Sequence, residues 1–244
     1  MSGKIYHVMS LIPQNGAKYV TVNLGFFTKK RKKDSEVLLI DLDFDNPTLG
    51  YFYTKDSVYS IDNLVPVKND LKKNTFKNNI TKTSLGFDIL KGSSVKSNNY
   101  ISSNLVATVL NLAKEIYDYV FVVTQSDLKN SNVAITLLNA DEVILVLKNN
   151  YSNLVKSTGF LQEIQPFIRK ESHLNMILNY KDYRNEVNIS EIIKESNNEM
   201  NINYLGVLDY DAKSTDNLNL KEKNFFKRAS VNDRVFKHIC KKIL

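Results

Sequence analysis

The sequence predicts a single α/β domain built on a doubly wound, mostly parallel sheet of about seven strands with helices on both faces. Short apolar runs of strand length alternate with longer amphipathic stretches along the whole chain. That alternation is typical of a parallel sheet covered on both sides. The 244 residues, of which 43% are hydrophobic, are enough for one core of this kind. We therefore assign residues 1–244 to one domain.

The first half of the chain contains the clearest strand. Residues 36–41 (EVLLID) form a nearly continuous apolar run, as expected for a strand buried on both faces. The other elements expected in this half are a strand at 5–11, a helix at 18–30, a strand at 87–90, a helix at 105–116 and a strand at 119–123. The Lys/Asn-rich stretch around residues 69–82 predicts an insertion.

The same alternation continues in the second half. Strands are expected at 142–147, 174–178 and 204–208, and helices at 153–168, 190–196 and 228–244. Pro166 marks the end of the first of these helices, and Ser190 is a typical N-cap for the second. Parallel sheets bind ligands at the carboxyl ends of their strands. Polar residues that follow the strands are therefore the candidates for function.

Composition predicts a cytoplasmic protein. No apolar run reaches the length of a membrane span, no signal peptide begins the chain, and one cysteine, Cys240, cannot form an internal disulfide. His7, His173 and His238 lack metal-ligand spacing. The net charge of +7 favours anionic partners. Lysines are spread along the whole chain, however, and the run at 29–33 complements a helix dipole, so nucleic acid is not the expected partner.

Five segments resemble, in order, the MinD/ParA ATPases. That family carries a deviant Walker motif, LLIDxDxxxxxxG, and binds ATP as a homodimer. The segments are residues 38–50 (LLIDLDFDNPTLG), 117–123 (YDYVFVV), 140–146 (ADEVILV), 176–179 (MILN) and 203–211 (NYLGVLDYD). The resemblance implies a P-loop NTPase fold. Residues 60–64, 86–90 and 186–193 are similar to the CpaE/TadZ branch of the family, which serves pilus assembly.

The phosphate-binding loop departs from the family's pattern. When the family's NLA is matched to Asn23 and Leu24, residues 12–19 (IPQNGAKY) align with KGGVGKTT. A P-loop needs glycines, a lysine on the phosphates and a hydroxyl on Mg²⁺. Gly16 alone matches. The two lysine positions hold Ile12 and Ala17, the hydroxyl position holds Lys18, and the Mg²⁺-orienting Asp is replaced by Val123.

These losses predict that ordinary ATP hydrolysis is absent, because each missing transition-state donor costs about 10²–10³ in rate. No catalytic residue is predicted. The resemblance offers Asp41 and Asp43 as vestigial Mg²⁺ and water ligands, or as inherited polar strand-end residues without that role. It offers Gly16, Ala17, Lys18, Tyr19 and Asn179 as nucleotide contacts, where Asn179 contacts adenine or only caps a turn. The sequence predicts either ATP·Mg²⁺ bound without turnover or no cofactor.

Three hypotheses of function follow. The first is a non-hydrolysing, homodimeric positioning or assembly factor for a pilus, secretion or conjugation system. The second is a weakly active ATPase with a rearranged loop that uses Lys18. The third is a DNA-partition protein that uses the positive charge. The last helix is basic and amphipathic, so it either packs on the sheet or contacts the inner face of the membrane.

Overall fold

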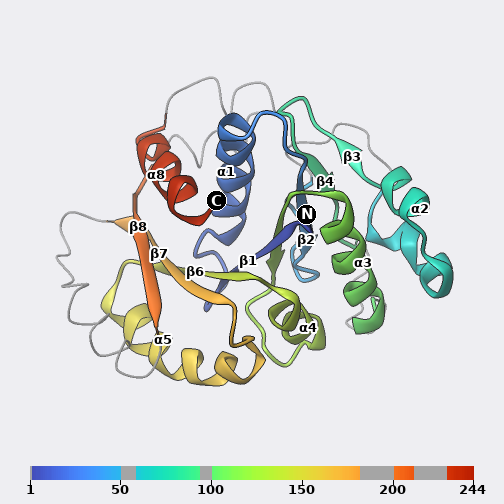
Figure 1. Cartoon of the computed structure of the whole chain (residues 1–244). Coiled ribbons are helices and arrows are strands. Elements are labelled where there is room, and N and C mark those ends of the chain that lie inside the picture. Colours follow the sequence, from blue (N-terminus) through green and yellow to red (C-terminus); the bar gives the residue numbers. More distant parts are fainter. Residues whose placement is uncertain (1, 51–58, 94–100, 182–200, 212–229) are drawn as a thin grey trace.

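The computed structural model describes residues 2–50, 59–93, 101–181, 201–211 and 230–244 (Figure 1). The helix predicted at 190–196 and the family-like segment 186–193 lie outside the described residues.

One eight-stranded sheet forms the centre of the domain, in the order β3-β4-β2-β5-β1-β6-β7-β8. All the pairings are parallel except that of β3 with β4. This confirms the predicted class. β3 has only two residues and no apolar pattern, so the sequence could not reveal it. The strands are β1 (Lys4–Ser10), β2 (Val37–Leu42), β3 (Thr81–Lys82), β4 (Asp88–Leu90), β5 (Tyr119–Thr124), β6 (Glu142–Lys148), β7 (His173–Lys181) and β8 (Ile202–Asp209).

Helices cover both faces of the sheet, as Figure 1 shows. Helices α1 (Ala17–Arg31) and α8 (Asp233–Ile243) lie on one face and share one apolar cluster. The opposite face packs against a second cluster. Its helices are η1 (Ile61–Asp70), α2 (Lys73–Asn78), α3 (Ser103–Ile116), α4 (Ser131–Asn139), α5 (Tyr151–Ile164) and η2 (Gln165–Phe167).

The central strands are apolar on both faces because both faces are covered. Every residue of β2 is buried, including Asp41. In the sheet register Val123 of β5 is opposite both Val8 of β1 and Asp41 of β2. The loops that follow these three strands therefore leave the sheet at the same edge, which brings together the loop before α1 and the loop after β2.

The stretch around residues 69–82 has regular structure. It contains the end of η1, helix α2 and strand β3. Phe76 of α2 is completely buried, and α2 packs against α3. Whether this stretch is an insertion relative to similar proteins stays a prediction.

The last helix is shorter than predicted, because it begins at Asp233. Just before it, the Asn232 side chain accepts a hydrogen bond from Asp209 N (2.8 Å) and donates one to Asp209 O (3.0 Å). These two bonds fix the chain to the end of β8. Residues 230–232 therefore form a turn rather than helix.

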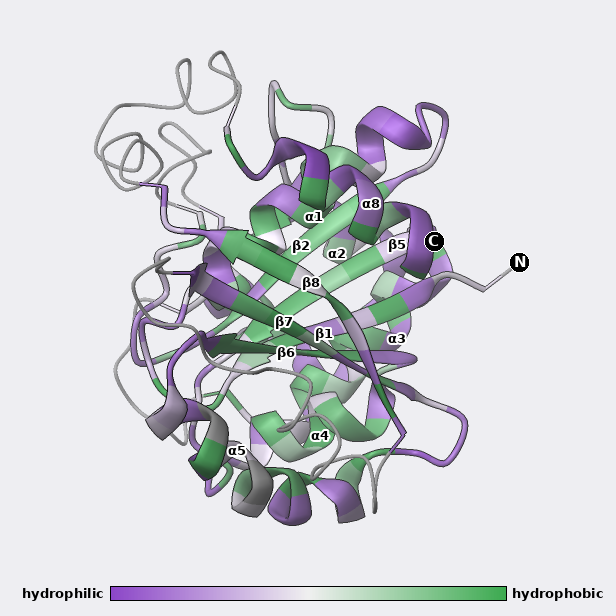
Figure 2. Cartoon of the chain, turned by 90° about the vertical axis from the view of Figure 1, so that its left-hand side faces the viewer, coloured by the Kyte–Doolittle hydropathy of each residue, from purple (hydrophilic) through white to green (hydrophobic). Residues whose placement is uncertain are grey.

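The apolar side of α8 packs on the domain (Figure 2). Phe236, Ile239, Cys240 and Ile243 are buried, and the Phe236 ring stacks on Phe27 of α1 with centroids 6.0 Å apart. The exposed side carries Arg234, Lys237, His238, Lys241 and Lys242. Of the two alternatives for this helix, the structure has the packed one. In the described part of the chain, no helix combines the length and apolarity needed to cross a bilayer.

Candidate functional site

The loop between β1 and α1, residues 11–16, is shaped around Gly16. This residue has φ 95° and ψ 19°, in the left-handed region that favours glycine. A Cβ at this position would lie 2.2 Å from Asn179 Nδ2. The close approach of Asn179 therefore requires glycine here, which is a packing reason for the one family glycine that the loop retains.

Asn179, at the carboxyl side of β7, fastens this loop to the sheet. The residue is 2% exposed. Nδ2 donates to Asn15 O at 2.9 Å, and Oδ1 accepts from Tyr180 N at 2.9 Å. Both ends of the amide are thus bonded within the chain. This geometry favours the turn-capping interpretation of Asn179, and its contact with adenine stays a prediction.

Three more asparagine side chains continue the network, and no sequence pattern marks them. The buried Asn15 side chain donates from Nδ2 to Asn153 Oδ1 at 2.8 Å. Asn153 Nδ2 in turn donates to Asn150 Oδ1 at 2.9 Å. The loop is therefore bonded to the start of α5 as well as to β7. Asparagine is abundant in the whole sequence, so these particular ones carried no signal.

Tyr180 also lies beside the loop. Its hydroxyl is 3.6 Å from the place where a Cβ on Gly16 would be. Its backbone has φ 58°, which is uncommon for a residue other than glycine. The Tyr210 ring is a neighbour, with centroids 6.1 Å apart, and burial raises the pKa of the Tyr180 hydroxyl. Nothing in the sequence marks a positive φ at tyrosine, so this residue was missed too.

Lys18, in the first turn of α1, engages the loop after β2. Its Nζ lies 2.8 Å from Asp43 Oδ2 and donates to the Asn46 carbonyl and, at 3.3 Å, to Thr48 Oγ1. An ammonium group has three N–H donors, and three acceptors of this one loop surround it. The lysine that could have compensated for the altered P-loop is therefore bonded to another loop.

Asp41 uses both carboxylate oxygens to shape that same loop. Oδ1 accepts from Asp43 N at 3.1 Å and Oδ2 from Leu49 N at 2.8 Å. The residue is completely buried. Burial raises the pKa of Asp41 to about 7, against the opposing effects of Lys18 and the two backbone N–H groups. The neighbouring Val123 is buried in the apolar cluster and offers no polar group.

The structure brings together most of the predicted site residues. Gly16 meets Asn179, and Lys18 meets Asp43 close to Asp41. Ala17 and Tyr19 are different, because Ala17 is buried in the apolar cluster and the Tyr19 ring packs edge-on against Phe236 of α8. Among the described residues, no group of three or more His, Cys, Asp or Glu side chains is arranged to hold a metal ion.

These residues do not fit a phosphate and its Mg²⁺ in the usual P-loop manner. Residues 12–15 contribute no cation, and Lys18 is bonded to Asp43. Both carboxylate oxygens of Asp41 already accept hydrogen bonds from backbone N–H groups. The arrangement can hold two loops in one conformation. Among the site residues that the structure describes, the one cation of the loop, Lys18, is already bonded to Asp43.

The fold is that of the ParA/MinD class of P-loop ATPases. A ParA family ATPase from Chlorobium tepidum TLS superposes with a TM-score of 0.82 over 98% of this chain and 97% of its own, at 17% identity. A chain of the MinC:MinD cell division protein complex of Aquifex aeolicus gives 0.79 over 98% and 95%, at 15% identity. The septum site-determining protein MinD of Pyrococcus horikoshii OT3, complexed with Mg-ADP, gives 0.77 over 99% and 96%, at 19% identity.

The sequence itself matches no protein-family model and no curated protein. At these low identities the structural similarity establishes the fold alone. The chemistry of this chain has to be argued from its own residues.

Proposed function

We propose that this chain is a MinD/ParA-like protein without ATP hydrolysis that acts as a positioning or assembly factor. The observation that carries the proposal is the position of Lys18, whose ammonium group is bonded to Asp43 Oδ2, Asn46 O and Thr48 Oγ1. The only cation among residues 11–19 is thereby occupied. Phosphoryl transfer depends on positive groups placed on the transferred phosphate, and this loop has none to place there.

The magnitude of the loss supports a protein without turnover. A hydrogen bond to a charged group is worth roughly 1.5–3 kcal/mol. Ile12 and Ala17, which stand at the two lysine positions, cannot make such hydrogen bonds. Each lost transition-state donor lowers the rate about 10²–10³-fold. Backbone N–H groups at the start of α1 retain a weak attraction for anions. Binding of ATP without cleavage is therefore compatible with the proposal, and cleavage is not.

The contact between Lys18 and Asp43 also supports a working conformation that needs no nucleotide. It joins α1 to the loop after β2 through groups of this chain alone. In the proposal the protein is a homodimer whose contact face is formed by the loops around Gly16, Asp41 and Val123. Dimerisation is then expected to be the same with ATP·Mg²⁺ and without it, as analytical ultracentrifugation can measure.

Calorimetry with ATP·Mg²⁺ and an assay of phosphate release test the absence of turnover. We expect release no greater than that of buffer, and the same result for Asp43→Ala. As a control, a double variant that restores the family's lysines (Ile12→Lys with Ala17→Lys) shows whether the assay detects a repaired loop. Release by the wild-type chain that disappears in Asp43→Ala would refute the proposal.

The machine that the protein serves is proposed from the resemblance to the CpaE/TadZ branch. It would be a pilus, secretion or conjugation system, with the protein in the cytoplasm at the inner face of the membrane. In the source organism, deletion of the gene is expected to abolish pilus formation, secretion or conjugation and to leave growth unchanged. Complementation by Asp43→Ala, which lacks the central carboxylate of the Lys18 contact, separates a need for this contact from a need for the chain as such.

A second candidate function, DNA partition, is favoured by one surface. The exposed side of α8 carries Arg234, Lys237 and Lys241. Burial raises the pKa of Cys240 in α8, and the charge of Arg31 at the end of α1 acts against this rise. Among the described residues, none of these four cations forms an ion pair. A gel shift that weakens steeply with salt, and that Arg234→Gln with Lys237→Gln and Lys241→Gln abolishes, would support this function over the first.

A further inference from the structure

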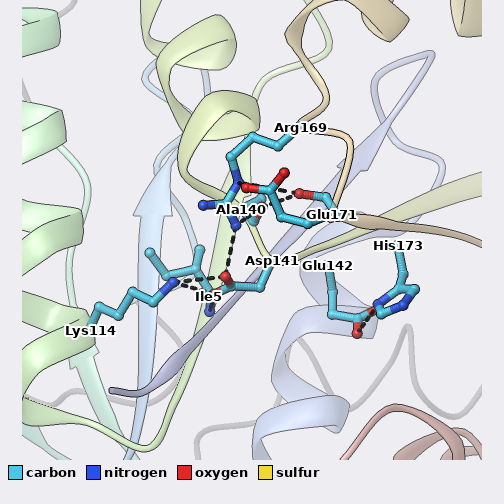
Figure 3. A network of polar contacts seen from close by, with 9 residues as sticks. Ile5, Lys114, Ala140, Asp141, Glu142, Arg169, Glu171 and His173 are labelled. Carbon is cyan, nitrogen blue, oxygen red and sulfur yellow. Dashed lines mark hydrogen bonds and ion pairs between the residues drawn. The ribbon is translucent and has the colours of Figure 1, made fainter. Parts of the chain in front are cut away.

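Two consecutive carboxylates at the amino end of β6, those of Asp141 and Glu142, have very different surroundings (Figure 3). Asp141 is bonded by Lys114 Nζ at 2.7 and 2.8 Å and by Arg169 Nη2 at 2.8 Å, and it accepts from Ile5 N at 2.8 Å. Although burial acts to raise it, these partners keep the pKa of Asp141 below its usual range. Asp141 thus has two permanently charged partners.

Glu142 is the more buried of the two and has no such partner. Its side chain is 8% exposed, compared with 23% for Asp141. Oε1 lies 3.0 Å from His173 Nδ1, and Oε2 accepts from Asn175 Nδ2 at 2.7 Å. Among the described residues, His173 is the only basic side chain in ion-pair contact with Glu142, and its side chain is 64% exposed. A buried carboxylate without a permanent cation is a costly arrangement.

The carboxylate borders an open groove of about 590 Å³. The groove lies at the amino ends of β6, β7 and β8, at the opposite end of the sheet from residues 11–16, and is closed on one side by the end of α8. Its other lining residues are His173, Asn175, Ile202, Asn203, Tyr204, Leu205, Lys242 and Ile243.

The groove offers hydrogen-bond acceptors. An ionised carboxylate has about four acceptor positions, and the contacts of Glu142 with His173 and Asn175 occupy two of them. Asn175 Oδ1 receives no donor from the described residues, since only Nδ2 of that amide is bonded. The Tyr204 carbonyl accepts a contact of 3.4 Å from the exposed Lys242, which is long for a hydrogen bond.

We propose that this groove binds an organic cation, an ammonium or guanidinium group, with Glu142 as its counter-ion. Such a group supplies the permanent positive charge that Glu142 lacks, and its N–H donors match the acceptors of the groove. The cation comes from a basic side chain of a partner polypeptide or from a free polyamine. The site is independent of the proposed function, since it lies at the opposite end of the sheet from the altered P-loop.

Nuclear magnetic resonance of the full chain tests the site with two probes, the peptide acetyl-Gly-Arg-Gly-amide and putrescine. Binding is followed through the Asn175 side-chain amide and the His173 ring protons. We expect a Kd of about 1 mM for a single anchoring group. Glu142→Gln, which keeps the shape and removes the charge, is expected to weaken binding at least about tenfold. The matched control is Glu36→Gln, which removes a carboxylate from a separate hollow of about 380 Å³ and should leave the Kd unchanged.

A second variant keeps Glu142 in place, so it tests the site even if Glu142→Gln does not fold. Lys242→Ala removes a competing positive charge and is expected to lower the Kd. Saturation by the peptide alone assigns the groove to a partner's side chain, and saturation by putrescine alone assigns it to a free polyamine; either supports the site. Absence of shifts with both probes would overturn the proposal, as would unchanged binding in Glu142→Gln or weaker binding in Lys242→Ala.

Discussion

Lys18 Nζ and Asp43 Oδ2 lie 2.8 Å apart, so the first turn of α1 is joined to the loop that leaves β2. Both side chains are largely shielded, at 21% and 18% exposed. In a P-loop the lysine and the hydroxyl at the start of the helix face the phosphates and Mg²⁺. Here the lysine in the first turn of α1 is bonded to the loop after β2. Lys18 belongs to the altered segment 12–19. Its contact with Asp43 therefore supports the proposal of a protein that keeps one conformation without ATP.

The first prediction concerns the stability that this ion pair contributes. Lys18→Met is expected to lower the free energy of unfolding by about 1 kcal/mol, because a partly shielded pair with further acceptors is worth somewhat more than a surface pair. Urea denaturation measures it. The control is Lys73→Met, which breaks a pair of equal length with Glu115 whose side chains are 58% and 53% exposed, and should change stability little. Equal effects of both variants would contradict the structural role of Lys18.

The second prediction concerns Gly16. Gly16→Ala is expected to destabilise the protein by about 1–3 kcal/mol, because alanine at φ 95° is strained and its Cβ would lie 2.2 Å from Asn179 Nδ2. Gly159, inside α5, is the control, since a Cβ there meets nothing within 4 Å. Gly159→Ala should stabilise by about 0.5–1 kcal/mol. Opposite signs in thermal denaturation are expected, and a stabilising Gly16→Ala would show that the loop geometry is different.

The fold could be predicted from the sequence because its strongest signals are apolar runs. β2, β5 and β6 are buried on both faces and appear as nearly continuous apolar segments, with Asp41 near the end of β2. The elements that were missed, β3 and α4 among them, are short. β3 is a two-residue edge strand. In the first turn of α4 (Ser131–Asn139), the Asn132 side chain donates to Ile101 O, a contact between distant segments that no local pattern reveals.

The site could be predicted only in part. Motif alignment marks Gly16, Lys18, Asp41, Asp43 and Asn179 because they stand at the ends of predicted strands or at the start of a helix. Alignment does not reveal what each side chain contacts. The bond from Lys18 to Asp43 spans 25 residues and that from Asn179 to Asn15 spans 164, so both depend on the tertiary structure. The position of Tyr180 depends on a positive φ that its residue type does not suggest.

The third prediction concerns pH. Burial raises the pKa of Asp41 from 3.8 to about 7, so between these values the folded state keeps a proton that the unfolded state has lost. The contribution of Asp41 to stability is therefore fully present below pH 4 and is lost as the pH rises through 7, with a slope of up to about 1.4 kcal/mol per pH unit. Unfolding free energies of the wild type and Asp41→Asn are compared from pH 4 to 8.

The difference in unfolding free energy between the wild type and Asp41→Asn tests the raised pKa of Asp41. Asp41→Asn has no group that titrates at this position, so the wild type should lose stability relative to the variant up to about pH 7 and no further above it. A constant difference across the range would show that Asp41 titrates at the same pH in the folded and unfolded states.

The fourth prediction concerns Asn179. Asn179→Ala leaves Asn15 O and Tyr180 N without their partner in a buried place, and is expected to lower stability by about 1–3 kcal/mol. Calorimetry with ATP·Mg²⁺ should give the same heat for the variant and the wild type. Asn139→Ala is the control, because it removes a bond to a backbone carbonyl, Ile135 O, within a helix. Loss of measurable ATP binding in Asn179→Ala alone would instead support the contact with adenine.

The fifth prediction concerns α8 and membranes. Because Phe236, Ile239 and Ile243 are buried against the domain, Ile239→Ala is expected to cost about 2–5 kcal/mol of stability. Any attachment to vesicles containing phosphatidylserine should depend on the exposed Arg234, Lys237 and Lys241. Co-sedimentation is then expected to fall as salt rises, and to be lost when these three residues are changed to glutamine. Sedimentation of that variant in high salt would mean that α8 leaves the domain and inserts its apolar side into the lipid.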